Sequence, residues 1–188
     1  MILYLAPGAC SLSDHIALHE AGLNFDHVRT HRTEDGRDYT VINPKGYVPA
    51  LLLDSGEILT ENIAILSWIS DLPALFGDFV RYRLLEALAY VSTEIHKSFK
   101  PYFTPGATED AKASAGQTIL KRLTFIAERL NQDYLLGAGF SVADAYLFVM
   151  LMWARKNGLS LPDPLPAYFV RMKARPAVQR SLKEEGLL

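Results

Sequence analysis

Residues 6–14 read Ala6-Pro7-Gly8-Ala9-Cys10-Ser11-Leu12-Ser13-Asp14, and they join an apolar run to the start of a helix. The preceding run, residues 2–6, has the length and composition of a buried strand, and the Pro-Gly pair after it is typical of a turn. Ser11 followed by Asp14 resembles a capping box, so Ser11 is predicted to be the N-cap of the next helix. The stretch therefore predicts a strand, a tight turn and a helix in succession.

Cys10 is the only cysteine of the chain and lies just before this predicted helix. Free backbone amides and the positive end of the helix dipole favour an anion there, so the thiol is expected to ionise more easily than an ordinary cysteine. A lone cysteine is also often a small buried apolar residue. The stretch alone leaves both a reactive and a structural cysteine open.

Composition bounds the class of protein. The 188 residues are 49% apolar with a formal net charge of -2, enough for a real core in one large or two small domains. Acids and bases are mixed, so no basic stripe for nucleic acid is present. The longest apolar run, residues 145–154, is too short to span a membrane. One cysteine and the absence of a signal-peptide pattern lead us to expect a cytoplasmic protein.

The first part of the chain alternates strands and helices. After the helix at 11–21, residues 25–30 form a predicted strand, whereas 33–45 are polar and carry at most one irregular helix. Residues 48–53 and 57–59 are predicted to pair as antiparallel strands around a turn, and the next helix, from Thr60 to about Leu72, has an apolar stripe that suits packing on a sheet. This order predicts an α/β layer unit.

From residue 78 onward the long segments are helical. A first helix is expected to end at Pro101, with Tyr82, Glu86, Ala89, Thr93 and His96 along one face. A second helix is predicted from residue 108 to about 131, and a third, apolar on nearly all sides, after a capping pattern of Ser141 and Asp144. Two short helices at 166–175 and 176–185 begin with proline. We therefore predict domains at 1–72 and 78–188, joined by a linker at 73–77.

Two places in the first domain suggest recognition of a small ligand. Glu61 and Asn62 fall in the first turn of the helix predicted to be capped by Thr60, where backbone amides suit a carboxylate and Glu61 suits an ammonium group. Ordinary complementarity to the helix dipole explains an acid there as well. Pro49 follows Val48 at the start of an apolar strand, which fits either an edge-strand proline or a cis peptide bond that turns Val48 toward an extended peptide.

Histidines are the remaining candidates. His96 is expected to border a cleft, where its imidazole can donate a hydrogen bond to a thiolate, although a surface or interdomain histidine is the commoner case. His15 and His19 have the i, i+4 spacing of helical metal ligands. No third ligand is indicated, so no metal is expected.

Five motifs together resemble the bacterial beta-class glutathione transferases, and they run in order through nearly the whole chain. They are Ala6-Pro7-Gly8-Ala9-Cys10-Ser11-Leu12, Asn43-Pro44-Lys45-Gly46-Tyr47-Val48-Pro49-Ala50-Leu51, Leu59-Thr60-Glu61, Thr93-Glu94-Ile95-His96-Lys97 and Ser141-Val142-Ala143-Asp144-Ala145-Tyr146-Leu147. The resemblance implies a thioredoxin-like N-terminal domain followed by an all-helical C-terminal domain, an α/β plus all-α fold that agrees with the pattern. It also implies a homodimer.

The resemblance further implies a glutathione site. Cys10 would lie beside the glutathione sulfur and Val48, before a cis Pro49, would pair with the tripeptide backbone. Glu61 and Asn62 would hold the γ-glutamyl group. From the helical domain, His96 and Lys97 would reach the site. Arg32 is the expected contact of the glycyl carboxylate.

The implied activity is attack of a glutathione thiolate on a small electrophilic, mostly apolar substrate. Two alternatives remain open: thiol-disulfide exchange or peroxide reduction through Cys10, and a non-catalytic glutathione-binding protein on the same scaffold. The last rests on departures from the family pattern, namely Ala89 where members commonly have asparagine, Asn62 in place of serine or glycine, and shortened loops.

Overall fold

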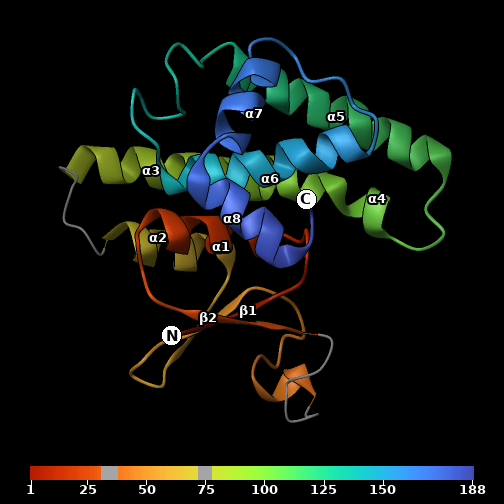
Figure 1. Ribbon diagram of the computed structural model, residues 1–188. Helices are drawn as coiled ribbons and strands as arrows, with labels where there is room; N and C mark the ends of the chain where they lie inside the picture. Colours follow the sequence, from red (N-terminus) through yellow and green to blue (C-terminus); the bar gives the residue numbers. More distant parts are fainter. Residues whose placement is uncertain (31–37, 72–77) are drawn as a thin grey trace. The chain divides into compact units, whose positions relative to one another are not determined.

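The computed structural model of the protein describes residues 1–30, 38–71 and 78–188 (Figure 1). Contacts divide the chain into two compact units, one made of Met1–Leu75 with Ala174–Leu188 and the other of Phe76–Lys173. The predicted linker at 73–77 lies outside the described residues. The last helix of the chain belongs by its contacts to the first unit, whereas the sequence analysis grouped it with 78–188.

The first unit is built on one mixed sheet with the strand order β2-β1-β3-β4. The central strand β1 (Ile2–Leu5) pairs in parallel with β2 (Asp26–Arg29), and α1 (Leu12–Glu20) is the crossover between them. Strands β3 (Ala50–Leu52) and β4 (Ile58–Thr60) add antiparallel partners on the other side of β1. The predicted thioredoxin-like order is confirmed, although β3 begins at Ala50 and not at residue 48.

The register of these strands places the end of β1, the start of β3 and the end of β4 together at one edge of the sheet. Tyr4 lies opposite Ala50, and Ala50 lies opposite Thr60. Strand β1 ends at Leu5, β3 begins at Ala50, and β4 ends at Thr60. The segments before Ala50 and after Thr60 therefore lie at the same edge as the turn that follows β1.

The start of α1 differs from the expected capping box. Ser11 is the N-cap residue, but its side chain makes no cap hydrogen bond. Its hydroxyl instead contacts the Ala6 backbone, accepting from the amide nitrogen at 3.2 Å and donating to the carbonyl at 3.4 Å. Asp14 is fully buried. The prediction that Ser11 and Asp14 cap each other is wrong, because both side chains are used to join α1 to neighbouring segments.

Helix α1 is packed between α2 (Asn62–Asp71) and α8 (Pro176–Glu185), the latter shown in blue beside it in Figure 1. The Arg175 guanidinium, just before α8, forms a two-pronged pair with the Glu20 carboxylate, with N···O distances of 2.5 and 2.8 Å. A left-handed Gly186 (φ 75°) ends the helix. The predicted helix at 176–185 is confirmed, and it completes the first unit.

The second unit is helical. Its elements are α3 (Asp78–Tyr90), the π-helical turn η2 (Val91–Ile95), the 3-10 turn η3 (His96–Phe99), α4 (Lys100–Phe103), α5 (Glu109–Ala127), α6 (Val142–Lys156) and α7 (Leu165–Lys173). Pro101 does not end the first helix as predicted, because it falls in the first turn of α4, where its missing N–H costs nothing. None of the described helices is long and apolar enough to cross a membrane.

Helix α6 is buried along nearly its whole length, as its apolar composition predicts, and a buried carboxylate holds its start. Asp144 accepts hydrogen bonds from the Ser141 amide (2.8 Å) and hydroxyl (2.7 Å), from the Leu135 amide (2.8 Å) and from the Tyr168 hydroxyl (2.8 Å). The predicted pairing of Ser141 with Asp144 is confirmed. One side chain thus ties α6, α7 and the loop before α6 together.

Replacing Asp144 with alanine is expected to lower the free energy of unfolding of the helical unit by about 3–5 kcal/mol, because it leaves several buried donors without an acceptor. Urea unfolding followed by circular dichroism measures this loss. The matched control is Asp110→Ala, at an exposed position in the first turn of α5, expected to cost under about 1 kcal/mol. Equal losses in the two variants would contradict the assigned role of Asp144.

Candidate functional site

The turn between β1 and α1 holds Cys10 at the sheet edge described above. The turn is closed by the Ala9 amide donating to the Ala6 carbonyl at 3.0 Å, and Gly8 adopts a left-handed conformation (φ 70°) that favours glycine. The Cys10 Sγ lies 3.5 Å from the Val48 carbonyl oxygen. The structure therefore brings together Cys10 and Val48, two of the predicted site residues from distant parts of the sequence.

The Val48–Pro49 peptide bond is cis, as the family resemblance implies. The preceding turn is held by buried Asn43, whose side-chain amide donates to the Tyr47 carbonyl at 2.6 Å while its oxygen accepts from the Lys45 amide at 3.1 Å. Because β3 begins only at Ala50, the backbone of Val48 lies outside the strand pairing. Its carbonyl faces the Cys10 thiol instead.

Glu61 lies between β4 and α2 with a left-handed backbone (φ 76°), which is uncommon for a residue with a side chain. Helix α2 begins at Asn62, so the prediction that Thr60 caps it is wrong. The Glu61 side chain is 51% exposed and accepts from Lys45 Nζ at 2.5 Å and from the Tyr47 hydroxyl at 2.8 Å. The hydrogen bond to Glu61 raises the pKa of Lys45.

The sequence analysis did not assign Lys45 and Tyr47 to the site. Both belong to a quoted family motif, and their positions beside the predicted cis proline were the available signal. A cation and a hydroxyl on the same carboxylate fix where Glu61 points. Lys45 and Glu61 also place a positive and a negative charge at this edge, which suits a ligand that carries both a carboxylate and an ammonium group.

Asn62 uses its side chain inside the unit. Its amide nitrogen lies within hydrogen-bond distance of the Cys10 carbonyl (3.0 Å), the Ser13 hydroxyl (2.7 Å) and the Asp14 carboxylate (2.9 Å). The residue is 7% exposed. Asn62 therefore positions the Cys10 turn against α2, and what it can offer a ligand is its backbone amide.

The environment of Cys10 reverses the expected acidity. Burial, and after it the charge of Asp14, raises the pKa of the Cys10 thiol to about 12, although hydrogen bonds from backbone amides act to lower it. Burial also raises the pKa of the Asp14 carboxyl well above its usual range, so Asp14 holds its proton and adds little negative charge near Cys10. Burial is therefore the main cause of the raised pKa of the thiol. The prediction of an easily ionised cysteine is wrong: desolvation outweighs the helix dipole.

His96 and Lys97 lie in the helical unit at the junction of η2 and η3. The π turn shifts the register of the helix, so the single face predicted from Tyr82 to His96 is not continuous. His96 Nδ1 lies 2.6 Å from the Tyr146 hydroxyl, and its ring meets Trp153 edge to face. Burial and then the charge of exposed Lys97 lower the pKa of His96. Breaks of this kind in a helix are frequent at functional sites.

Arg32, predicted to bind a carboxylate, lies outside the described residues. A cavity of about 360 Å³ lies within the helical unit, lined by side chains that include Tyr90, Phe125 and Leu130. Neither His96 nor Lys97 lines it. The described residues thus form two groups, one around Cys10 and Glu61 in the first unit and one around His96 in the second.

The raised pKa of Cys10 predicts slow alkylation near neutral pH. Relative to a cysteine at 9.0, a pKa of about 12 lowers the thiolate fraction at pH 8 by about 1000-fold. Iodoacetamide labelling followed by mass spectrometry measures the rate, and the single cysteine makes the product unambiguous. Labelling at the rate of a free cysteine-containing peptide would contradict the buried-thiol assignment.

The lowered pKa of His96 predicts that its imidazole titrates below 6.5. Because the unfolded chain takes up this proton more readily than the folded one, His96 removes stability as pH falls below 6.5. An NMR titration of the ring proton measures the midpoint. In Lys97→Gln the midpoint is expected to rise, since a nearby positive charge is lost, whereas Lys112→Gln, on α5, serves as the control. A midpoint above 6.5 would rule out the assigned environment.

Comparison with known proteins identifies the family. The model of the glutathione S-transferase N-terminal domain matches residues 9–72, and that of the C-terminal domain matches residues 90–176. Glutathione S-transferase GstA of Escherichia coli O157:H7 is 42% identical over 200 residues, and glutathione S-transferase GST-4.5 of Xanthomonas campestris pv. campestris is 39% identical over 207, each alignment covering all of both chains.

Solved structures agree with this assignment. A sphingomonad glutathione S-transferase complexed with glutathione is 44% identical with a TM-score of 0.93, and the bacterial beta-class enzyme of Sphingomonas chungbukensis is 44% identical with a TM-score of 0.92. Both comparisons cover all of each chain. The resemblance inferred from the five sequence motifs is confirmed. The chain therefore belongs to the glutathione S-transferase family and is similar to a bacterial beta-class member.

Proposed function

We propose that the protein transfers glutathione to small electrophilic, mostly apolar substrates. The single observation that carries the proposal is the convergence of the Cys10 thiol, the Val48 carbonyl and the Glu61 segment at one edge of the first unit's sheet. Glutathione is a tripeptide with a thiol on its central residue and an amino-acid group at one end. It needs one partner for the thiol, one for its backbone and one for the amino-acid group. The family membership supports the same reaction.

The proposed binding mode uses backbone groups and charges. Glu61 accepts from the γ-glutamyl ammonium group, and the amides at the start of α2, including that of Asn62, donate to its carboxylate. The backbone of Val48, held outside the strand pairing before the cis Pro49, pairs with the central residue of glutathione. Arg32 remains the predicted contact of the glycyl carboxylate, and Lys97 remains a predicted glutathione contact from the helical domain.

In this mechanism Cys10 donates a hydrogen bond and is not the attacking nucleophile. A thiol with a pKa of about 12 keeps its proton near neutral pH, so its S–H can hydrogen-bond to a glutathione thiolate and stabilise it. The imidazole of His96 is the second proposed donor. The thiolate then forms a carbon–sulfur bond with the electrophilic carbon as the leaving group departs with its electron pair. The same pKa argues against disulfide exchange started by Cys10.

Isothermal titration with glutathione tests the proposal. Glu61→Gln is expected to weaken binding about tenfold or more, since a hydrogen bond to a charged group contributes about 1.5–3 kcal/mol. Glu57→Gln, at an exposed position in the same hairpin, is the matched control and should bind as the unmodified protein does. No detectable binding by the unmodified protein at millimolar glutathione would overturn the proposal.

Conjugation of a generic aryl halide then separates transfer from binding alone. His96→Ala is expected to lower the rate of conjugation while glutathione still binds, and an unmodified protein that binds without conjugating would favour the non-catalytic alternative. A homodimer and a role in detoxifying electrophiles are further expectations that rest on the family resemblance, and light scattering measures the oligomeric state. The expectation of a cytoplasmic location rests on the single cysteine and the signal-peptide argument.

A further inference from the structure

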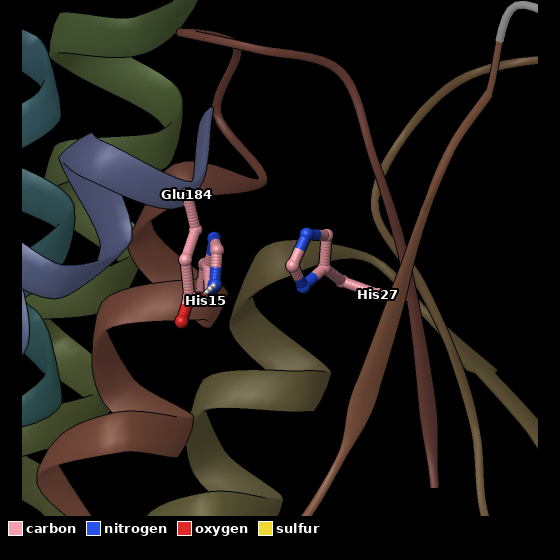
Figure 2. A group of neighbouring side chains, drawn as sticks. All are labelled: His15, His27 and Glu184. Carbon is pink, nitrogen blue, oxygen red and sulfur yellow. Dashed lines mark hydrogen bonds and ion pairs between the residues drawn. The ribbon is translucent and has the colours of Figure 1, made fainter. Parts of the chain in front are cut away.

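A cluster of imidazoles and carboxylates lies in the first unit, where α1, β2 and α8 meet (Figure 2). His15 comes from α1, His27 from β2 and Glu184 from α8. One ligand-capable atom from each lies within 4.8 Å of the others. His15 is buried, while His27 and Glu184 are partly buried. None of these residues has a role in the proposed transfer reaction.

His15 is held between two carboxylates. Its Nδ1 lies 3.0 Å from Glu185 Oε1 and its Nε2 lies 2.9 Å from Glu184 Oε2, and both its own side chain and that of Glu185 are 0% exposed. A neutral imidazole has only one N–H to donate. With Nδ1–H given to Glu185, the lone pair on Nε2 faces a carboxylate oxygen, so the contact needs either a second proton or a cation bound by both atoms.

Other groups point at the same place. His19, one turn along α1, brings its Nε2 to 2.9 Å from the same oxygen of Glu184. The His27 ring lies 5.1 Å from that of His15, centroid to centroid, and Figure 2 shows it directed toward His15 and Glu184. Within the described ranges, no residue forms a hydrogen bond with the His27 ring. Its nitrogens are available to a ligand.

One oxygen of the Glu184 carboxylate is held by an arginine, and the other faces the histidines. Arg180 Nε donates to its Oε1 at 2.8 Å, and the Arg29 guanidinium donates to its backbone carbonyl at 3.1 Å. With Oε1 engaged by Arg180, the Oε2 of Glu184 is the oxygen that faces His15 and His19 or a cation.

We propose that His15, His27 and Glu184 form a site for a divalent zinc-class metal ion, with His19 or a water molecule as the fourth ligand. Imidazole nitrogen and carboxylate oxygen are ligands that zinc takes in proteins. Tetrahedral zinc with bonds of about 2.0–2.1 Å holds its ligands about 3.3 Å apart. The three atoms lie within 4.8 Å of one another, so the widest pair would close in by at most about 1.5 Å, whereas the 2.9 Å contact of His15 with Glu184 would open by about 0.4 Å.

The surroundings match what such a site needs. A metal-binding histidine usually donates its other N–H to a carboxylate, which fixes the ring and its tautomer, and Glu185 provides this contact to His15. Two carboxylates, those of Glu184 and Glu185, lie beside His15 and favour a cation there, although Arg180 donates to one of them. The site would fasten α8 to α1 and β2, a structural and not a catalytic role.

The sequence analysis found only two of the necessary parts. His15 and His19 were noted for their helical spacing and set aside because no third ligand was indicated. His27 lies on a strand, and Glu184 lies 169 residues beyond His15 along the chain. The fold brings them together through α8, so the expectation of no metal gives way here to a proposal that can be tested.

Metal titration of the purified full-length chain without an affinity tag tests the site. Zinc content by mass spectrometry is expected to reach one ion per chain, and added Co²⁺ is expected to give the visible spectrum of a four-coordinate ion that zinc displaces. Because protons compete with the metal for the imidazoles, the affinity should fall as the pH is lowered. Saturating zinc should raise the unfolding temperature.

His27→Gln and Glu184→Gln are expected to weaken zinc binding at least about tenfold, the lower end of what loss of a supporting contact costs, and to remove the thermal shift. Their matched controls are His96→Gln, in the helical unit, and Glu109→Gln, at an exposed position on α5. Circular dichroism checks that each variant folds. The proposal is overturned if fewer than one zinc ion binds per chain, or if His27→Gln binds zinc as tightly as the unmodified protein does. In that case hydrogen bonds alone hold His15 between the two glutamates.

Discussion

The register of three hydrogen-bonded strands is the constraint on which the first unit depends. Because Tyr4, Ala50 and Thr60 align across the sheet, the turn after β1, the segment before β3 and the start of α2 all meet at one edge. A shift of one residue in either pairing would turn the side chains of a strand to the opposite face. The contact between Cys10 and Val48 and the approach of Asn62 to Cys10 both follow from this alignment.

Burial decides the chemistry at that edge. The start of α1 offers backbone amides that favour a thiolate, yet Cys10 is partly buried beside the fully buried Asp14, and desolvation keeps the proton on its sulfur. Two general effects of opposite sign act on one sulfur, and removal from solvent is the larger. A thiol that keeps its proton can donate a hydrogen bond to a second, ionised thiol.

Much of the fold followed from pattern and turn chemistry, because these act locally. The order of strands and helices, the buried helix α6 with its Ser141 and Asp144 start, and the helix at 176–185 were all predictable. The N-cap position of Ser11 was predicted correctly, but not its side-chain contacts, which go to the Ala6 backbone. The start of α2 was placed at Thr60 instead of Asn62, and the Thr60 hydroxyl accepts from Lys45. The π turn before His96 and the inward turn of Asn62 depend on tertiary packing, which local sequence does not encode.

The contacts of Glu185 have a consequence for how the chain can be assembled. Its carboxylate accepts from the Gly8 amide at 2.8 Å and lies 3.0 Å from His15 Nδ1, residues that leave the ribosome far earlier. The segment that carries the cysteine is thus secured by a helix that is synthesised after the whole helical unit. The first unit cannot gain these contacts until α8 has been made, and residues 1–75 moved alone by recombination would lack them.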